Sequence, residues 1–318
     1  MAAGRGGEER YGISFSSLDE ELFDGAGVTK RHLVDYLDAM ADPLVTVLRD
    51  RPLSTIRVRA GHEPFMQKNL PKYAPDWIPT VSVWAQASHR DVSYALCNDR
   101  RTLLWFANQR AVEYHVTLVH ADDWMHPTHA VLDLDPPAGE RFDQVVRTAL
   151  LVRRALQESG LEGAVKTSGA KGLHIYIPLR DESVEDVAAA TRALALRAER
   201  LDPDLATTAF VREERGGRVF LDSTRAGGAT VVAAFSPRAR PGVPVSFPVA
   251  WDDLDRITPA DFTIRTAPDL AGDRDPWSDA MPAPQRLPAD LIEEGHQIPI
   301  ARVAAMHAGK RRKREAQS

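Results

Sequence analysis

Cysteine is almost absent from this chain of 318 residues, which contains only Cys97. A single cysteine can form no internal disulfide, so disulfide-rich scaffolds and cysteine-based structural zinc sites are excluded. Long hydrophobic runs are also missing, because the longest apolar stretch, around residues 229–235, is far shorter than the ~20 residues that cross a bilayer. Residues 1–8 carry Arg5 but no apolar segment after it, so we expect no signal peptide and a cytoplasmic protein.

The sequence also lacks a strong net charge, because 40 Lys and Arg residues stand against 45 Asp and Glu residues, for a formal charge of −5. Such a chain has no general attraction to nucleic acid, so any binding of nucleic acid must depend on local clusters of charge. Two basic clusters are present, namely the arginines between residues 212 and 240 and the tail at residues 310–314. For the tail, a solvated surface is an equally good explanation.

An amphipathic helix is indicated at residues 29–49 by a stripe of leucines, with Thr29 as its N-cap and Pro43 as a kink or break. Runs of β-branched and aromatic residues indicate strands at residues 54–59, 80–84, 92–97 and 111–118. The last of these strands brings Glu113 and His115 to one face. A short helix is expected at residues 101–110. We therefore expect an N-terminal α/β module over about residues 11–118, preceded by a flexible terminus at residues 1–10.

From residue 129 the pattern becomes regular, in the order β-α-β-β-α-β. The strands are expected at residues 129–134, 164–167, 174–178 and 218–221, with an additional strand at 230–235, and the helices at residues 142–156 and from Ser183 to about residue 200. This order is that of the split, ferredoxin-like (RRM-like) sheet. The expected fold class is therefore α+β, with a catalytic sheet over about residues 119–265. Five prolines then predict that residues 266–318 form an extended connector, a short helix and a disordered basic tail.

Two carboxylates, Asp133 and Asp135, end the first strand of this sheet. Alternate residues of a strand share a face, so the two carboxylates point the same way, about 7 Å apart. Hard oxygen ligands of this kind suit Mg²⁺ or Mn²⁺, and two such ions can clamp the attacking and leaving oxygens of phosphoryl transfer. The alternative is structural, because an Asp followed by prolines also starts turns.

The connection between the next two strands, residues 168–172, contains two glycines, a serine and Lys171. Its backbone N–H groups could face outward beside a hydroxyl and an ammonium group, which is the chemistry of a phosphate cradle, although Ser-Gly and Lys-Gly are also common turn sequences. His174 follows at the start of a strand. Because the first strand of a ferredoxin-like sheet lies between the third and fourth, we expect Asp133, Asp135, His174 and Asp222 to converge.

The combined set Asp133-x-Asp135, Ser168-x-x-Lys171-Gly172-x-His174 and Asp222 resembles the polymerase (primase-polymerase) domain of bacterial DNA ligase D, in the archaeo-eukaryotic primase superfamily. The resemblance extends over about residues 11–251. Shorter matching stretches are Asp19–Phe23, Thr29–Lys30, Arg51–Leu53, Phe65–Lys68, Ala74–Trp77, Trp105–His115, Ser236–Arg240 and Ala239–Gly242. A chain of this length has no room for ligase or nuclease domains, so we expect a stand-alone member.

The resemblance implies roles for individual residues. Asp133, Asp135 and Asp222 would be the catalytic carboxylates that hold two divalent ions, Mn or Mg. The incoming nucleotide would contact His115, Ser168, Lys171, Gly172, His174, Arg57 and one or both of Arg238 and Arg240, with Arg240 preferred. DNA would contact Lys30, Phe65, Met66, Lys68 and Arg215.

The implied function is that of a template-directed DNA repair polymerase, which adds nucleoside triphosphates, preferably ribonucleotides, to a DNA primer 3′-OH during gap filling or end joining in the bacterial nucleoid. Gapped or broken DNA, nucleotides and end-joining proteins such as Ku or a ligase would be its partners. The sequence departs from the family at Met66, where a second aromatic residue is usual, at Ala226, which replaces an Asn, and at Glu20. In end-joining members a lysine that binds a DNA 5′-phosphate stands at the position of Glu20, whereas a second such lysine is retained as Lys30.

Two other functions use the same residues. A metal-dependent phosphoesterase or nuclease needs the three carboxylates but no triphosphate pocket, so residues 168–174 and the arginines at 238 and 240 favour the polymerase. A nonenzymatic RRM-like module should display aromatic side chains on its sheet, where this sequence places carboxylates.

Overall fold

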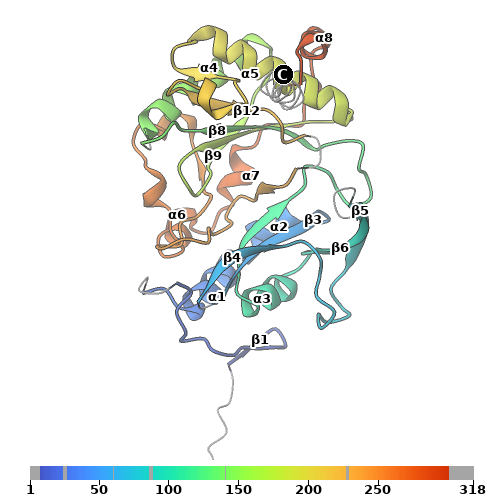
Figure 1. Ribbon diagram of the computed structural model, residues 1–318. Coiled ribbons are helices and arrows are strands. Elements are labelled where there is room, and N and C mark those ends of the chain that lie inside the picture. The colour runs from blue at the N-terminus through green and yellow to red at the C-terminus, as the bar shows by residue number, and fades with distance from the viewer. Residues whose placement is uncertain are drawn as a thin grey trace, which may run out of the picture.

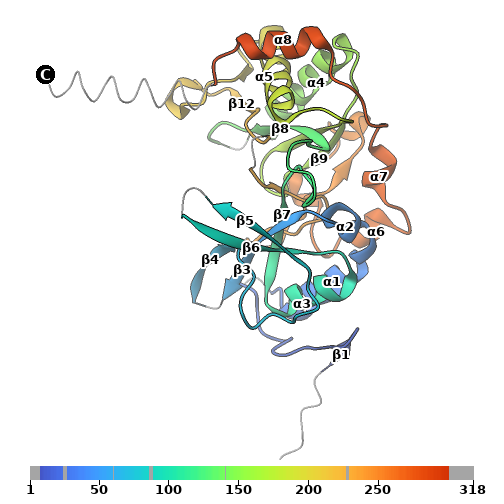
Figure 2. The same cartoon turned by 90° about the vertical axis from the view of Figure 1, so that its right-hand side faces the viewer.

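Two β-sheets lie one above the other in the computed structural model, which describes residues 8–23, 27–59, 61–85, 89–139, 141–226 and 229–300 (Figures 1 and 2). The strands are β1 Glu9–Arg10, β2 Ile13–Ser14, β3 Pro52–Arg59, β4 His62–Gln67, β5 Thr80–Ala85, β6 Arg90–Leu96, β7 Ala111–Val116, β8 His129–Asp135, β9 Ala164–Thr167, β10 Leu173–Pro178, β11 Ala206–Thr207, β12 Val219–Asp222, β13 Val231–Val232 and β14 Pro248–Val249. The helices are α1 Lys30–Ala39, α2 Ala41–Leu48, α3 Arg100–Asn108, α4 Phe142–Glu158, α5 Val184–Leu201, α6 Ala267–Ala271, α7 Pro276–Ala280 and α8 Ala289–Gln297.

The first sheet has the strand order β13-β7-β3-β6-β5, with β4 paired to β3. The predicted leucine stripe is buried against it, and the predicted break is confirmed, since α1 ends before Met40 and Pro43 lies in the first turn of α2. Strand β4 was not predicted, because nearly all of its side chains are exposed and no alternation marks it. The predicted strand at residues 230–235 is reduced to β13, which returns to this sheet and pairs with β7.

The second sheet has the strand order β11-β12-β8-β10-β9-β14, which confirms the α+β fold and the split topology. Strand β8 lies between β10 and β12, and α4 and α5 cover one face (Figure 1). Ser183 caps α5 by accepting a hydrogen bond from Asp186 N at 3.1 Å, as the sequence predicts. Helix α8 approaches α5 so closely that a Cβ at Gly295 would lie 2.0 Å from Ala189 O. The strands of this sheet are buried, so close packing fixes the positions of the polar side chains at their ends.

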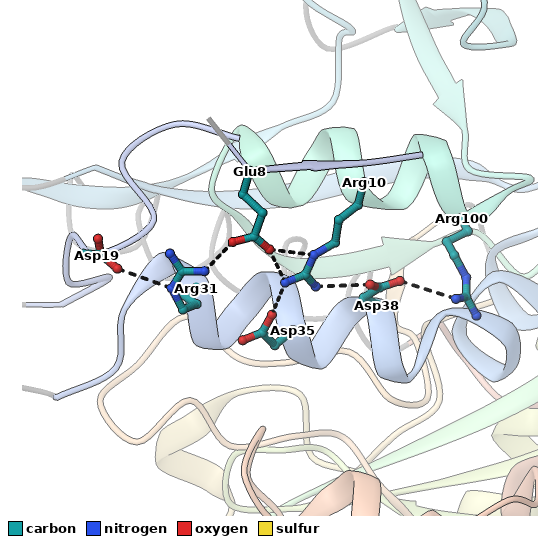
Figure 3. A network of polar contacts seen from close by, with 7 residues as sticks. All are labelled: Glu8, Arg10, Asp19, Arg31, Asp35, Asp38 and Arg100. Atoms are coloured by element: carbon teal, nitrogen blue, oxygen red, sulfur yellow. Dashed lines mark hydrogen bonds and ion pairs between the residues drawn. The ribbon is translucent and has the colours of Figure 1, made fainter. Parts of the chain in front are cut away.

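The N-terminal segment is more ordered than predicted, because β1 and β2 pair and are held to α1 by ion pairs (Figure 3). Arg10 contacts Glu8, Asp35 and Asp38 at 2.5–3.1 Å. The expected flexibility of residues 1–10 is therefore wrong for residues 8–10, and residues 1–7 lie outside the described residues.

The expected extended connector after residue 265 is also wrong. Prolines lie in the first turns of α6 and α7, where a missing N–H costs no helical hydrogen bond. Trp277 is buried, and its ring meets that of Tyr176 edge-on at 5.1 Å, so apolar packing outweighs the proline content. The predicted helix is α8, and the basic tail, residues 301–318, lies outside the described residues. In the described part of the chain, every helix is too short or too polar to cross a membrane.

Candidate active site

A row of polar side chains crosses the second sheet. Asp222 of β12 pairs directly with Asp133 of β8, Asp133 pairs with His174 of β10, and His174 pairs with Lys166 of β9. Directly opposed residues share a face of the sheet, and Asp135, two residues after Asp133, shares it as well. The expected convergence of Asp133, Asp135, Asp222 and His174 is therefore confirmed by the register of three neighbouring strands, β12, β8 and β10.

Arg225 joins two of these carboxylates. Its Nη2 lies 2.6 Å from Asp133 Oδ2 and 3.0 Å from Asp222 Oδ2. Asp222 also accepts hydrogen bonds from the backbone N–H and the hydroxyl of Thr224 at 2.9 and 2.6 Å. Burial acts to raise the pKa of Asp133, but His174 and Arg225 together lower that pKa below its ordinary value. Asp133 is therefore an anion, and Arg225 is its counter-charge.

The pKa of Asp135 is shifted in the opposite direction from that of Asp133. Burial, followed by the charges of Asp133 and Asp222, raises the pKa of Asp135 to about 6, and Arg225 and Arg215 offset this only in part. In the described ranges, no three His, Cys, Asp or Glu side chains are arranged to hold a metal ion, and Arg225 Nη2 contacts both Asp133 and Asp222. The donor set is nevertheless three carboxylates with unbalanced negative charge, which fits a divalent cation.

His174 connects the carboxylates to Lys166. The imidazole is buried, with Nε2 3.2 Å from Asp133 Oδ1 and Nδ1 3.0 Å from Lys166 Nζ. Burial, followed by the charge of Lys166, lowers the pKa of His174 to about 4, so the ring is neutral near pH 7. Lys166 is itself completely buried and donates a hydrogen bond to Ser246 Oγ at 2.5 Å.

The loop at residues 168–172 differs from the expected cradle. The N–H groups of Ala170 and Gly172 donate to Ser168 Oγ at 3.2 and 3.1 Å instead of facing outward, because the serine hydroxyl closes a local turn. Gly172 is required for packing, since a Cβ there would lie 2.1 Å from Leu134 O. Lys171 is exposed on the loop. The loop therefore presents its lysine, and not a set of free backbone N–H groups, to solvent.

Arg238 connects this loop to the first sheet. Its Nη1 donates to Ser168 O, and its Nε lies 3.1 Å from Glu113 Oε2. His115 Nε2 lies 2.7 Å from the same carboxylate oxygen. Burial acts to raise the pKa of Glu113, but His115, Arg238 and the N–H of Ala239 lower it to about 2. Arg240 is exposed, so the preference for Arg240 over Arg238 is not supported by the structure, because the chain turns between them and directs only Arg238 into the network.

A separate cavity of about 560 Å³ contains other predicted residues. Lys30 and Phe65 line it, and so does Arg57, which the sequence placed beside the nucleotide. Arg57 is held there by Gln109 O at 2.8 Å and Gln67 Oε1 at 3.0 Å, and its contact with the nucleotide stays a prediction.

Lys30 is buried at the base of this cavity, where its Nζ donates to Ser16 O and Asn108 Oδ1, both at 2.6 Å. Burial, followed by the charge of Arg110, lowers the pKa of Lys30 to about 8. Glu20 also lines the cavity and forms an ion pair with Arg110. The pairing explains how a carboxylate is accommodated beside Lys30.

The remaining predicted DNA contacts occupy two regions. Met66 and Lys68 are exposed on and just after β4, next to Phe65, which is also exposed. Arg215 instead lies beside the carboxylates, where its guanidinium stacks 3.7 Å from the Phe220 ring and its charge acts on Asp135. Arg215 is therefore nearer to the candidate active site than to the β4 surface.

Sequence reasoning missed Lys166, Arg225 and Glu113 as site residues. Lys166 interrupts an apolar strand and pairs in register with His174, a signal that alternation along the predicted hairpin could have supplied. Arg225 was seen only as one of a cluster of arginines, and nothing in the sequence shows that its guanidinium turns back onto Asp133 and Asp222.

The chain is similar to known proteins over most of its length. The family described as "LigD, primase-polymerase domain" matches residues 29–277. The bifunctional non-homologous end joining protein LigD of Bacillus subtilis is 33% identical over 88% of this chain and 46% of its own length, and the multifunctional LigD of Mycolicibacterium smegmatis is 32% identical over 80% and 34%. The chain thus spans less than half the length of these relatives.

A solved structure matches as well. The polymerase domain of Mycobacterium tuberculosis ligase D, in complex with DNA, superposes with a TM-score of 0.76 and 29% identity, covering 86% of this chain and all of that chain. Sequence and structure therefore agree on the fold that carries the carboxylate row. The chain belongs to the LigD primase-polymerase domain family, a family of metal-dependent nucleotidyltransferases found in non-homologous end-joining proteins.

Proposed function

We propose that this protein is a template-directed DNA repair polymerase that adds nucleoside triphosphates, preferably ribonucleotides, to a primer 3′-OH during gap filling or end joining. The observation that carries the proposal is the set of Asp133, Asp135 and Asp222 on one face of the sheet, with the pKa of Asp135 raised to about 6. Membership of the polymerase family favours this reaction over the phosphoesterase or nuclease alternative.

The three carboxylates would hold the divalent cations, Mn²⁺ or Mg²⁺. When bound, the cations supply the Lewis acidity for attack of the 3′-OH on the α-phosphate. Arg225 would then withdraw from Asp133 Oδ2 and Asp222 Oδ2, because its guanidinium lies where a cation held by both carboxylates would bind, and the two positive charges repel each other. Freed in this way, its guanidinium is available to a phosphate oxygen.

The triphosphate would lie between the two sheets. Arg238 uses Nη1 and Nε on Ser168 O and Glu113, so two further donors on Nη2 are free to orient phosphate oxygens, with Lys171 as a second cation. His115 is fixed by Glu113 at 2.7 Å. Neutral His174 holds the orientation of Asp133 and adds no competing positive charge beside the metal carboxylates.

DNA would follow the exposed β4 surface of Phe65, Met66 and Lys68, where Phe65 can stack on a base, while Arg215 would contact the primer–template near the carboxylates. The cavity of Lys30 would receive a DNA 5′-phosphate. The DNA-bound state of the matched polymerase domain supports this partner. Ku or a ligase would deliver broken ends at the bacterial nucleoid, as the names of the relatives suggest.

Primer extension on gapped, recessed and blunt-ended duplexes tests the proposal, with ribonucleotides against deoxyribonucleotides and Mg²⁺ against Mn²⁺. We expect templated extension that is faster with ribonucleotides and absent without metal. Shortening of the primer without extension would instead support the nuclease alternative, and equal extension by wild type and Asp133→Ala would rule out catalysis at this site.

A further inference from the structure

Lys166 is a buried lysine in the middle of the second sheet, where burial, followed by the charge of Arg238, lowers its pKa well below the ordinary value. Its side chain is completely buried, and Nζ lies 2.5 Å from Ser246 Oγ, 3.0 Å from His174 Nδ1 and 5.5 Å from the centre of the Tyr176 ring. Burying an ammonium group costs free energy that an apolar residue on the same strand would not incur. The position of Lys166 therefore calls for a role that Val or Leu could not fill.

The directions of the hydrogen bonds around Lys166 are fixed by its neighbours. The Ser246 hydroxyl donates to Thr167 O at 2.7 Å, so Ser246 Oγ must accept from Lys166 Nζ. At the other side of the imidazole, His174 Nε2 lies 3.2 Å from the carboxylate oxygen Asp133 Oδ1, which can only accept. Nε2 therefore carries the proton, and the lone pair on Nδ1 accepts from Lys166 Nζ.

We propose that Lys166 is a positioning residue: its hydrogen bond to Nδ1 holds the His174 imidazole, whose Nε2–H tautomer Asp133 selects, and thereby fixes the orientation of the Asp133 carboxylate. The cross-strand pairs Lys166–His174 and His174–Asp133 place the three side chains in one row, so the effect passes through two direct contacts. The consequence for metal binding rests on the proposed function of Asp133. The consequence for the hydrogen bond at Nδ1 does not, because it follows from contacts present without metal.

The tautomer is measured on metal-free protein with ¹⁵N-labelled histidine, by long-range ¹H–¹⁵N correlation, with His174 assigned through His174→Gln. We expect wild type to show one protonated Nε2 and one unprotonated Nδ1. Lys166→Met removes the donor while keeping the length of the side chain. We expect the Nε2–H tautomer to persist, because Asp133 still accepts from Nε2, and the Nδ1 resonance to move downfield, because Nδ1 loses its hydrogen bond. Ser246→Ala leaves Nζ in place but removes its anchor, and serves as the second variant if Lys166→Met does not fold. Lys72→Met, an exposed lysine on the first half of the chain, is the matched control.

Mn²⁺ affinity, measured from free Mn²⁺ by electron paramagnetic resonance, gives the second readout. We expect Lys166→Met to weaken binding by roughly 10–100-fold, as removal of a group that orients a metal ligand commonly does, and to lower kcat more than it raises KM for the nucleotide. An unchanged Nδ1 resonance and unchanged Mn²⁺ affinity in both Lys166→Met and Ser246→Ala would overturn the proposal. A wild type that binds no Mn²⁺ would overturn the proposed function, while the Nδ1 resonance would still decide the role of Lys166.

Discussion

Asp133 and Asp222 face each other across the pairing of β8 with β12, and a single guanidinium nitrogen of Arg225 contacts both, at 2.6 and 3.0 Å. Two buried carboxylates this close repel each other unless a cation compensates them. Here the compensating cation comes from a side chain three residues after Asp222. The two carboxylates and Arg225 therefore form one electrostatic unit, and substitutions within it should not behave independently.

We predict that Asp133→Ala and Asp222→Ala each reduce nucleotide addition by at least about a thousandfold, because each removes a proposed ligand of the same cation site. Primer extension measures the loss, and circular dichroism checks that the fold is retained. Asp143→Ala, an exposed carboxylate at the start of α4, is the control and should retain activity. Robust extension by either active-site variant would contradict the assignment of the site.

Asp135→Asn should stabilise the metal-free protein while abolishing activity. The folded-state pKa of Asp135, about 6, lies above its unfolded value near 4, so the native state binds more protons between these pH values. The free energy of unfolding therefore falls as pH rises from about 4 to about 6, and the loss persists above pH 6. Asn removes this penalty, which is at most about 3 kcal/mol because one pKa unit corresponds to roughly 1.4 kcal/mol.

Urea unfolding of metal-free wild type and Asp135→Asn between pH 4 and pH 8 measures this difference. The variant should be the more stable protein at pH 7.5, and the two should converge towards pH 4. A constant difference across this range would show that packing, and not carboxylate repulsion, determines the effect.

Arg225→Gln should have the opposite effect on the metal-free protein. Without the guanidinium, Asp133 and Asp222 lose their shared counter-charge, so we expect a loss of about 1–3 kcal/mol, typical of breaking a partly buried charge pair. Added Mn²⁺ should restore more thermal stability to Arg225→Gln than it adds to wild type, because no side chain has to be displaced. Differential scanning fluorimetry across a Mn²⁺ titration measures both effects, and an equal Mn²⁺ response in the two proteins would argue against displacement.

The strand order of the second sheet could be predicted because each of its helices and strands is marked by a short, continuous stretch of sequence. Each helix has a clear apolar stripe, and Ser183 marks the start of α5. Strand order then placed Asp222 beside Asp133 without knowledge of any side-chain contact. Backbone topology in this region therefore follows from short-range sequence signals.

The missed features depend on contacts between residues far apart in the sequence. Arg57 and Lys30 lie in one cavity because β3 and α1 meet the end of α3, which no local pattern encodes. The packing of α7 depends on Trp277 meeting Tyr176, about a hundred residues earlier, so proline content alone gave the wrong result. Tertiary packing overrode local propensity in both places.

The ion pair between Glu20 and Arg110 leads to the last prediction, which concerns the 5′-phosphate. Lys30 already donates hydrogen bonds to Ser16 O and Asn108 Oδ1. A phosphate that binds Arg110 in this cavity must first displace Glu20 from it. Glu20→Gln releases Arg110, and Glu20→Lys adds a further cation. Both should increase the affinity gained from a 5′-phosphate on a gapped duplex, by roughly 10-fold, the effect of one charge-assisted hydrogen bond.

Fluorescence anisotropy with 5′-phosphate and 5′-hydroxyl versions of the same gapped duplex isolates this gain for each protein. Glu293→Gln removes one negative charge from α8, outside the cavity, and should leave the ratio of the two affinities unchanged, which separates a local contact from a change in net charge. Lys30→Ala should reduce the ratio, because it removes the buried ammonium group at the base of the cavity. Strong phosphate dependence that survives both Lys30→Ala and Arg110→Gln would contradict the role of the two cations that face Glu20, and the same measurement on Arg57→Gln and Arg59→Gln would show whether the 5′-phosphate binds in this cavity at all.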